Sequence, residues 1–194
     1  MSIEKYTTEA FILREYPQDE NDFVYKVWTK DFGVIFVLAR SIRKINAKLR
    51  MIAKKHEFLN MTLVKGKDIY RLTGVEETPM NYKFGEYSSQ VKKLIYEAID
   101  RFIEEKKSYK KLFEKLKFLT LAYNNLSPLE TSKLKILIYY LVLVDTGYAD
   151  AKIIGVKDIE EYKSFEMKDF YTHFILNEKE VKDHVVFVLK HSMV

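Results

Sequence analysis

The apolar residues of this chain follow two different periods, and the change between them limits the fold more than any other feature. In the first 78 residues, short runs such as Phe23–Thr29 alternate between two faces, as side chains do along a strand. From about position 87, apolar residues recur every three or four positions, which is the spacing of one face of a helix. Strands followed by helices predict an α+β protein, with a strand domain over residues 1–78 and a helical domain over residues 79–194.

Five strands are expected in the first domain. Their approximate ranges are 10–16, 23–29, 34–39, 57–64 and 69–75. Short turn sequences join the second strand to the third and the fourth to the fifth, whereas about fifteen residues separate the third strand from the fourth. A long connection after the third of five strands is the layout of an OB-fold, a small Greek-key barrel that often binds single-stranded nucleic acid. We therefore predict an N-terminal five-stranded OB-fold β-barrel.

Four helices are expected in the second domain. Apolar stripes over 91–102 and 109–123 predict the first two. The third, about 127–146, begins with Ser-Pro-Leu-Glu, in which Ser is a good N-cap and Pro suits the first helical position, and Gly147 would end it. Its middle is apolar on every side, so we expect it at the centre of an α-helical bundle. A last helix is expected at 177–190.

Positive charge is concentrated around the long connection. Between positions 40 and 67 there are nine basic residues and one acid, a net charge of +8 in a chain whose net charge is +5. Such a local excess is typical of a surface that binds phosphates, although a solvated basic face would show the same pattern. The candidate nucleic-acid-binding residues are Arg40, Arg43, Lys44, Lys48, Arg50, Lys54, Lys55, Lys65 and Lys67.

The sequence offers little for catalysis or metal binding. It has no Cys, four His residues without the spacing of a metal site, and no nucleotide-binding or nucleophile motif. We therefore expect no enzymatic activity, no metal and no cofactor. Base stacking on a barrel would use aromatic residues, and Tyr25, Trp28 and Tyr70 are candidates if they face outward.

Neither the first residues of the chain nor its longest apolar run predicts a membrane location. The first residues lack the basic-then-apolar layout of a signal peptide. The longest apolar run, Ile136–Val144, is about half of the ~20 residues that a spanning helix needs. We expect a cytoplasmic, nucleoid-associated protein with no membrane contact.

Two stretches resemble the RecO family of DNA repair and recombination mediators. Glu20 and Asp22 match an E-x-D after the first strand, and Thr29 and Gly33 match the T-x-x-x-G that follows. Lys135–Tyr148 resembles a later apolar helix of the family that ends in Leu-x-x-x-Gly-Tyr. The resemblance covers about residues 5–148. The chain departs from many family members because it lacks their four-Cys zinc site, and it is shorter than we expect at the C-terminal end.

The resemblance implies a function. RecO proteins bind single- and double-stranded DNA, anneal complementary strands and, with RecR, help to load RecA onto strands coated by single-stranded-DNA-binding protein. We expect the acidic tail of that protein to bind a basic stripe on the second helix, formed by Lys107, Lys111 and Lys115, although a solvated Lys-rich face is the simpler interpretation. Two alternatives remain open: a protein-interaction adaptor with a structural barrel, and an OB-type RNA-binding protein.

Overall fold

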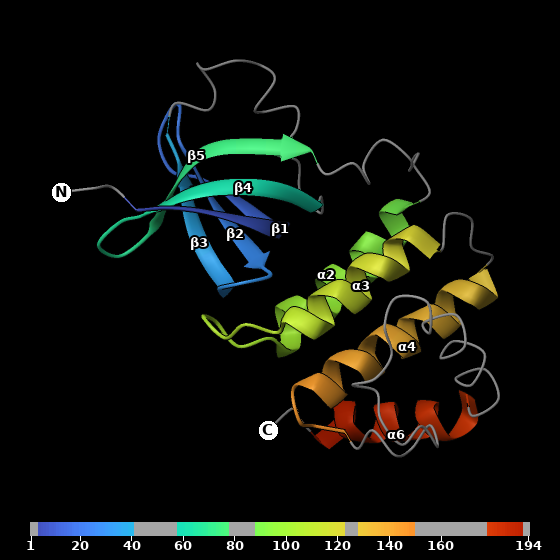
Figure 1. Ribbon diagram of the computed structural model, residues 1–194. Coiled ribbons are helices and arrows are strands. Elements are labelled where there is room, and N and C mark those ends of the chain that lie inside the picture. The colour runs from blue at the N-terminus through green and yellow to red at the C-terminus, as the bar shows by residue number, and fades with distance from the viewer. Residues whose placement is uncertain (1–3, 41–57, 78–87, 123–127, 150–177, 192–194) are drawn as a thin grey trace.

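The computed structural model describes residues 4–40, 58–77, 88–122, 128–149 and 178–191, and shows a β-barrel followed in sequence by helices (Figure 1). The elements are β1 (Lys5–Pro17), β2 (Phe23–Thr29), β3 (Gly33–Ala39), β4 (Phe58–Lys65), β5 (Tyr70–Glu77), α2 (Ser88–Phe102), α3 (Lys110–Ala122), α4 (Pro128–Asp145) and α6 (Glu178–His191). The predicted α+β class is confirmed.

The five strands close into a barrel in the order β1-β2-β3-β5-β4. The long strand β1 pairs with β4 through its first half and with β2 through its second half, and the β1–β2 register shifts between Ile12 and Arg14. The barrel closes where β3 and β5 run parallel. This is the predicted OB-fold. The strand β1 starts at Lys5, earlier than predicted, because its first residues pair with β4 rather than with β2.

Both sides of the barrel wall are buried where the helices cover it. Inside the barrel lies one apolar cluster, which includes Tyr25, Val27 and Met61. Outside, Trp28 packs against Phe113 of α3, with 4.8 Å between the ring centroids. Trp28 and other outward-facing apolar residues of the barrel pack with the helices in a second, continuous core. The barrel and the described helices therefore share apolar packing, and the division of the chain at residues 78/79 stays a prediction.

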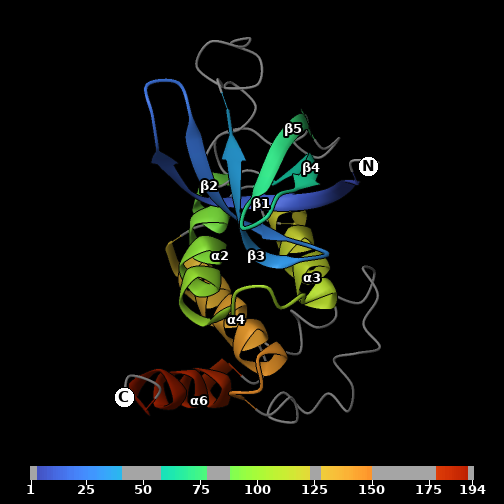
Figure 2. The same cartoon turned by 90° about the vertical axis from the view of Figure 1, so that its left-hand side faces the viewer.

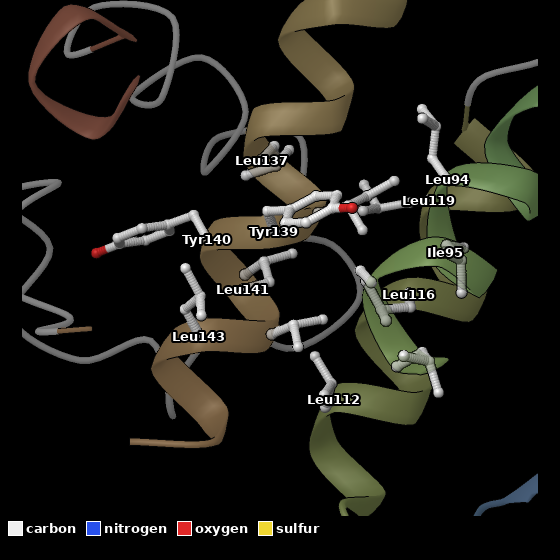
Figure 3. Packing of buried hydrophobic residues seen from close by; sticks show 14 of the residues in the cluster. Leu94, Ile95, Leu112, Leu116, Leu119, Leu137, Tyr139, Tyr140, Leu141 and Leu143 are labelled. Carbon is white, nitrogen blue, oxygen red and sulfur yellow. The ribbon is translucent and has the colours of Figure 1, made fainter. Parts of the chain in front are cut away.

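The helices form layers behind the barrel. The barrel rests on α2 and α3, α4 lies behind them, and α6 is farthest from the barrel (Figures 1 and 2). Residues 137–143 of α4 are all buried, as its uniformly apolar middle predicted. Figure 3 shows Tyr139 of α4 directed towards α2 and α3, with Tyr140 on the opposite side. Gly147 has a φ of 86° and ends the helix as predicted.

The connection between α2 and α3 pairs with the barrel. The backbone N–H of Lys106 donates to the carbonyl of Val34 in β3 at 3.0 Å. Ser108 adds a hydrogen bond from its hydroxyl to the carbonyl of Lys30 at 2.8 Å. These bonds attach the helical layer to the β2–β3 turn and to the start of β3, where β5 has no pairing residue in the described chain.

Ion pairs flank this connection on the α3 side. The Lys110 ammonium lies 2.9 Å from a carboxylate oxygen of Asp31, whose other oxygen accepts a hydrogen bond from Thr8. These two hydrogen bonds hold the pKa of Asp31 below its ordinary value, although burial opposes the shift. Lys117 of α3 contacts Glu9 of β1 in the same way. The helical layer is thus fixed to the barrel by apolar, backbone and ionic contacts.

Candidate nucleic-acid interface

Three of the nine predicted nucleic-acid-binding residues lie in the described part of the chain. Arg40 follows β3, Lys65 ends β4 and Lys67 lies in the β4–β5 turn, and all three are exposed. Strand pairing brings these positions to one end of the barrel, because Tyr70 is the partner of both Lys65 and Val37. The other six lie outside the described residues: Arg43, Lys44, Lys48, Arg50, Lys54 and Lys55.

The outer surface of β2 and β3 carries an exposed aromatic ring. Phe36 of β3 points out of the barrel and is 37% exposed. Its cross-strand partner is Lys26, whose partner on β1 is Arg14. Directly paired residues share one face of a sheet, so Arg14, Lys26 and Phe36 form a row across three strands.

A second row runs beside the first. Tyr16, which is 40% exposed, pairs with Val24, and Val24 pairs with Leu38. Leu38 in turn pairs with the exposed Arg71 of β5. We call the two rows together the β2–β3 face. It consists of Arg14, Tyr16, Val24, Lys26, Phe36, Leu38 and Arg71. In an OB-fold this is the surface that binds oligonucleotides.

The base of the β2–β3 face is bounded by α2. The Asp100 carboxylate pairs with Arg14 through one oxygen and with Lys26, at 3.0 Å, through the other. Tyr96, one turn earlier on α2, accepts a hydrogen bond from Arg14 Nε at 2.9 Å. Burial raises the pKa of Asp100, but the hydrogen bonds and charges of Lys26 and Arg14 outweigh burial, so the net pKa lies below the ordinary value.

The aromatic residues that the sequence suggested for stacking are not those on this face. Tyr25 is 2% exposed inside the barrel and Trp28 is fully buried beneath α3, so neither ring meets the condition of being exposed for stacking. Tyr70 is half-buried against Phe32, with ring centroids 5.6 Å apart. In the described part of the barrel, the exposed aromatic rings are Tyr16 and Phe36. A signal for Phe36 was present in the sequence, because a charged Lys26 in the neighbouring strand indicates an outward-facing position opposite it.

The predicted basic stripe for a protein partner is also wrong in its geometry. Lys107 precedes α3, which begins at Lys110, so it is not on the helix. Lys115 is 7% exposed and its ammonium bonds to Asp145 of α4 at 3.1 Å. Of the three residues, Lys107 and Lys111 are exposed. The three therefore do not form one exposed row.

Two of the residues that carry the family resemblance build the β2–β3 turn. The hydroxyl of Thr29 donates to the carbonyl of Gly33 and accepts from the N–H of Phe32, both at 2.9 Å. Thr29 is fully buried. Thr29 and Gly33 therefore shape the turn against which the α2–α3 connection packs.

Two further properties concern the described residues alone. They contain no group of three or more His, Asp or Glu side chains that could hold a metal ion. None of their helices combines the length and the apolar character that crossing a membrane requires.

The fold is a closed five-stranded barrel with an exposed aromatic and basic face and a helical bundle behind it. The chain is therefore an OB-fold protein. Residues 1–79 match the family model described as Recombination protein O N terminal. This match and the two relatives that follow support the RecO family, as the sequence resemblance indicated.

Two curated relatives carry the same family name. The chain is 30% identical over 141 residues to the DNA repair protein RecO of Caldicellulosiruptor bescii, a match that covers 68% of this chain and 57% of that protein. It is 27% identical over 114 residues to the DNA repair protein RecO of Alkaliphilus metalliredigens, covering 56% of this chain and 45% of that protein. The chain thus spans about half the length of the curated relatives it matches.

Proposed function

We propose that this chain acts in recombinational DNA repair by binding single-stranded DNA on the β2–β3 face. The match of residues 1–79 to the RecO family model and the names of the two relatives support the repair role. The observation that carries the binding site is Phe36, a large aromatic ring exposed in the middle of a strand and paired with a lysine. Phe36 belongs to neither apolar cluster, so packing of the buried core does not explain the presence of this ring.

The chemistry of the face suits a single strand. Bases stack on aromatic rings whatever their sequence, and Phe36 and Tyr16 would each offer such a ring. Phosphates between the bases would meet the exposed cations Arg71 and Arg40 at the edge of the face. The predicted basic residues of the connection between β3 and β4 would extend this charged edge. In this proposal the protein binds and positions DNA and turns over no substrate.

Truncation of the central ring tests the site. We expect Phe36→Ala to weaken binding of a labelled single-stranded oligonucleotide by about tenfold, since one base–aromatic stack contributes about 1–3 kcal/mol. The measurement is fluorescence anisotropy. Phe187→Ala is the matched control, because Phe187 lies on α6 and is 59% exposed but is far from the barrel (Figure 1). Equal binding by the wild type and Phe36→Ala would place the DNA elsewhere.

Annealing and partner binding belong to the same proposal at the level of the whole protein. We propose that the chain also binds double-stranded DNA, anneals complementary strands, and works with RecR and with the tail of single-stranded-DNA-binding protein. The test is annealing of two complementary oligonucleotides, one coated with that protein, in the presence and absence of RecR. If annealing is unchanged by the chain, the mediator role fails even where DNA binding is present.

A further inference from the structure

A single carboxylate holds two cations of the β2–β3 face. Asp100 of α2 bonds to both Arg14 and Lys26, and these two residues are neighbours in one row of the sheet. The Asp100 side chain is 17% exposed, Lys26 is 19% exposed and Arg14 is 45% exposed, so the cluster lies at the surface. Tyr96 fixes the orientation of the Arg14 guanidinium through Nε. The arrangement presents two cations to one bidentate anion.

We propose that Asp100 occupies a phosphate subsite of the β2–β3 face and that a phosphate of bound DNA displaces it. The proposal rests on the DNA-binding function proposed above. A carboxylate and a phosphate bind the same forked arrangement of N–H donors, so each can replace the other. Lys26 lies directly across the strand pair from Phe36, within about 5.5 Å between Cα atoms for paired residues. The phosphate next to a base stacked on Phe36 would therefore be close to this pair of cations.

The position of Asp100 on the helical layer gives the displacement a structural consequence. Asp100 connects α2 to the barrel on one side, while Lys110 and Lys117 of α3 connect to Asp31 and Glu9 on the other. A phosphate that takes Arg14 and Lys26 from Asp100 weakens the first connection and leaves the second intact. Asp100 and the phosphate compete for the same two cations, so a change at Asp100 that removes its contacts with Arg14 and Lys26 should strengthen DNA binding.

Removal of the carboxylate tests the proposal directly. Asp100→Asn keeps the shape of the side chain and should bind single-stranded DNA about fivefold more tightly than wild type. The variant should also steepen the dependence of log K on log salt by about 0.7, because it has no displaced carboxylate to take up a cation when the phosphate binds. Glu114→Gln is the matched control, because it removes a carboxylate that pairs with Lys30 on the α3 side and changes the net charge equally. It should change the affinity less than about twofold.

A second pair of variants separates a local effect from a general one. Arg14→Gln should weaken DNA binding more in the Asp100→Asn background than in wild type, because Asp100 already occupies Arg14 in wild type. Asp100→Ser removes the same carboxylate with a smaller side chain, and must reproduce the gain if Asp100→Asn does not fold. Circular dichroism checks that each variant keeps its helices.

The outcomes distinguish this proposal from the function on which it rests. Equal affinity of Asp100→Asn and Glu114→Gln, or equal effects of Arg14→Gln in both backgrounds, would overturn the phosphate subsite. If Phe36→Ala still loses binding in that case, the β2–β3 face remains the DNA site. If neither wild type nor Asp100→Asn binds DNA, the subsite and the proposed function both fail.

Discussion

Gly33 and Lys107 approach so closely that a Cβ atom on Gly33 would lie 2.2 Å from the backbone oxygen of Lys107. Gly33 opens β3 with a φ of 69°, a conformation that other L residues rarely adopt. The contact therefore needs glycine for two reasons, backbone conformation and space. It is the point at which the α2–α3 connection packs against the β2–β3 turn, and it explains why the T-x-x-x-G pattern ends in glycine.

Gly33→Ala should destabilise the protein strongly. The new methyl group would clash with the rigid backbone at Lys107 and would also strain a positive φ, so we expect a loss of at least about 3 kcal/mol in the free energy of unfolding. Urea denaturation measures it. Gly147→Ala is the control, because Gly147 also has a positive φ but a Cβ atom there would meet nothing within 4 Å; it should cost about 1 kcal/mol. Equal losses would show that backbone strain alone accounts for the effect.

Thr29→Val should destabilise the β2–β3 turn. Valine has the same shape but cannot bond to Gly33 or to the N–H of Phe32, and an unsatisfied buried donor costs about 1–3 kcal/mol. Thr73→Val is the matched control, since the Thr73 hydroxyl bonds to the carbonyl of Thr62 on an exposed surface. We expect the control to change thermal stability by less than about 0.5 kcal/mol. A loss no greater at Thr29 than at Thr73 would contradict the proposed role of the turn.

The barrel and the helices should unfold together, because they share one apolar core. Trp28 is the sole tryptophan, and its fluorescence reports on the contact with α3, whereas far-UV circular dichroism reports mainly on the helices. We expect the two signals to have the same midpoint in urea. Phe113→Ala should lower both midpoints together, with a loss of about 3–5 kcal/mol. Separate midpoints would indicate two independently folding domains.

Salt should weaken DNA binding steeply. If about five phosphates are contacted, log K should fall with log salt with a slope near −3.5 for a single strand. Charge reversal of three residues in the basic connection should sharply weaken binding without unfolding the protein. These residues are Arg43, Lys44 and Lys48.

The control for this reversal changes the net charge equally at a distant site. It reverses three exposed lysines of α6, Lys179, Lys182 and Lys190. We expect this control to retain most of the affinity. If the two triple variants bind DNA equally, long-range charge rather than the basic connection determines the affinity.

Acid should weaken the contacts between the barrel and the helices. Asp31 and Asp100 both have a pKa below the ordinary value of 3.8, because cations bond to their charged forms. Their stabilisation is therefore complete above about pH 5 and is lost as the pH falls through 3.8 towards the folded pKa values. Solvent screening limits the Asp100 contribution to about 1 kcal/mol. Thermal melts from about pH 6 to about pH 3 should show a shallower decline for Asp100→Asn than for wild type.

Much of the fold was predictable because local chemistry determines it. The alternation over Phe23–Thr29 predicted β2 with its observed bounds, since a strand between two turns leaves little choice of limits. Gly147 ended the third predicted helix because its backbone adopts a left-handed conformation. The long connection after β3 indicated the barrel topology that the structure shows. In each case neighbouring residues carry the information.

The positions of the candidate site residues were less predictable because they depend on distant contacts. The two faces of β2 are both buried near its end, Val27 inside the barrel and Trp28 beneath α3, so alternation did not reveal which ring was exposed. Lys115 looked solvated on the sequence, but α3 lies between the barrel and α4, where Asp145 pairs with it. The basic connection lies outside the described residues, and its role in DNA binding stays a prediction.

The closure of the barrel has a consequence for how the β2–β3 face moves. In the described residues β3 and β5 pair at two positions, whereas each of the other four neighbouring strand pairs is in register at seven. Among the described strand pairs, the β3–β5 ladder therefore has the fewest paired positions, and we expect local opening of the barrel to begin there. Amide protons beside Leu38 and Arg71 should exchange with solvent earlier than those between β1 and β2. If the β2–β3 face binds DNA as proposed, opening along this line would let the face adjust its width to nucleotides of different sizes.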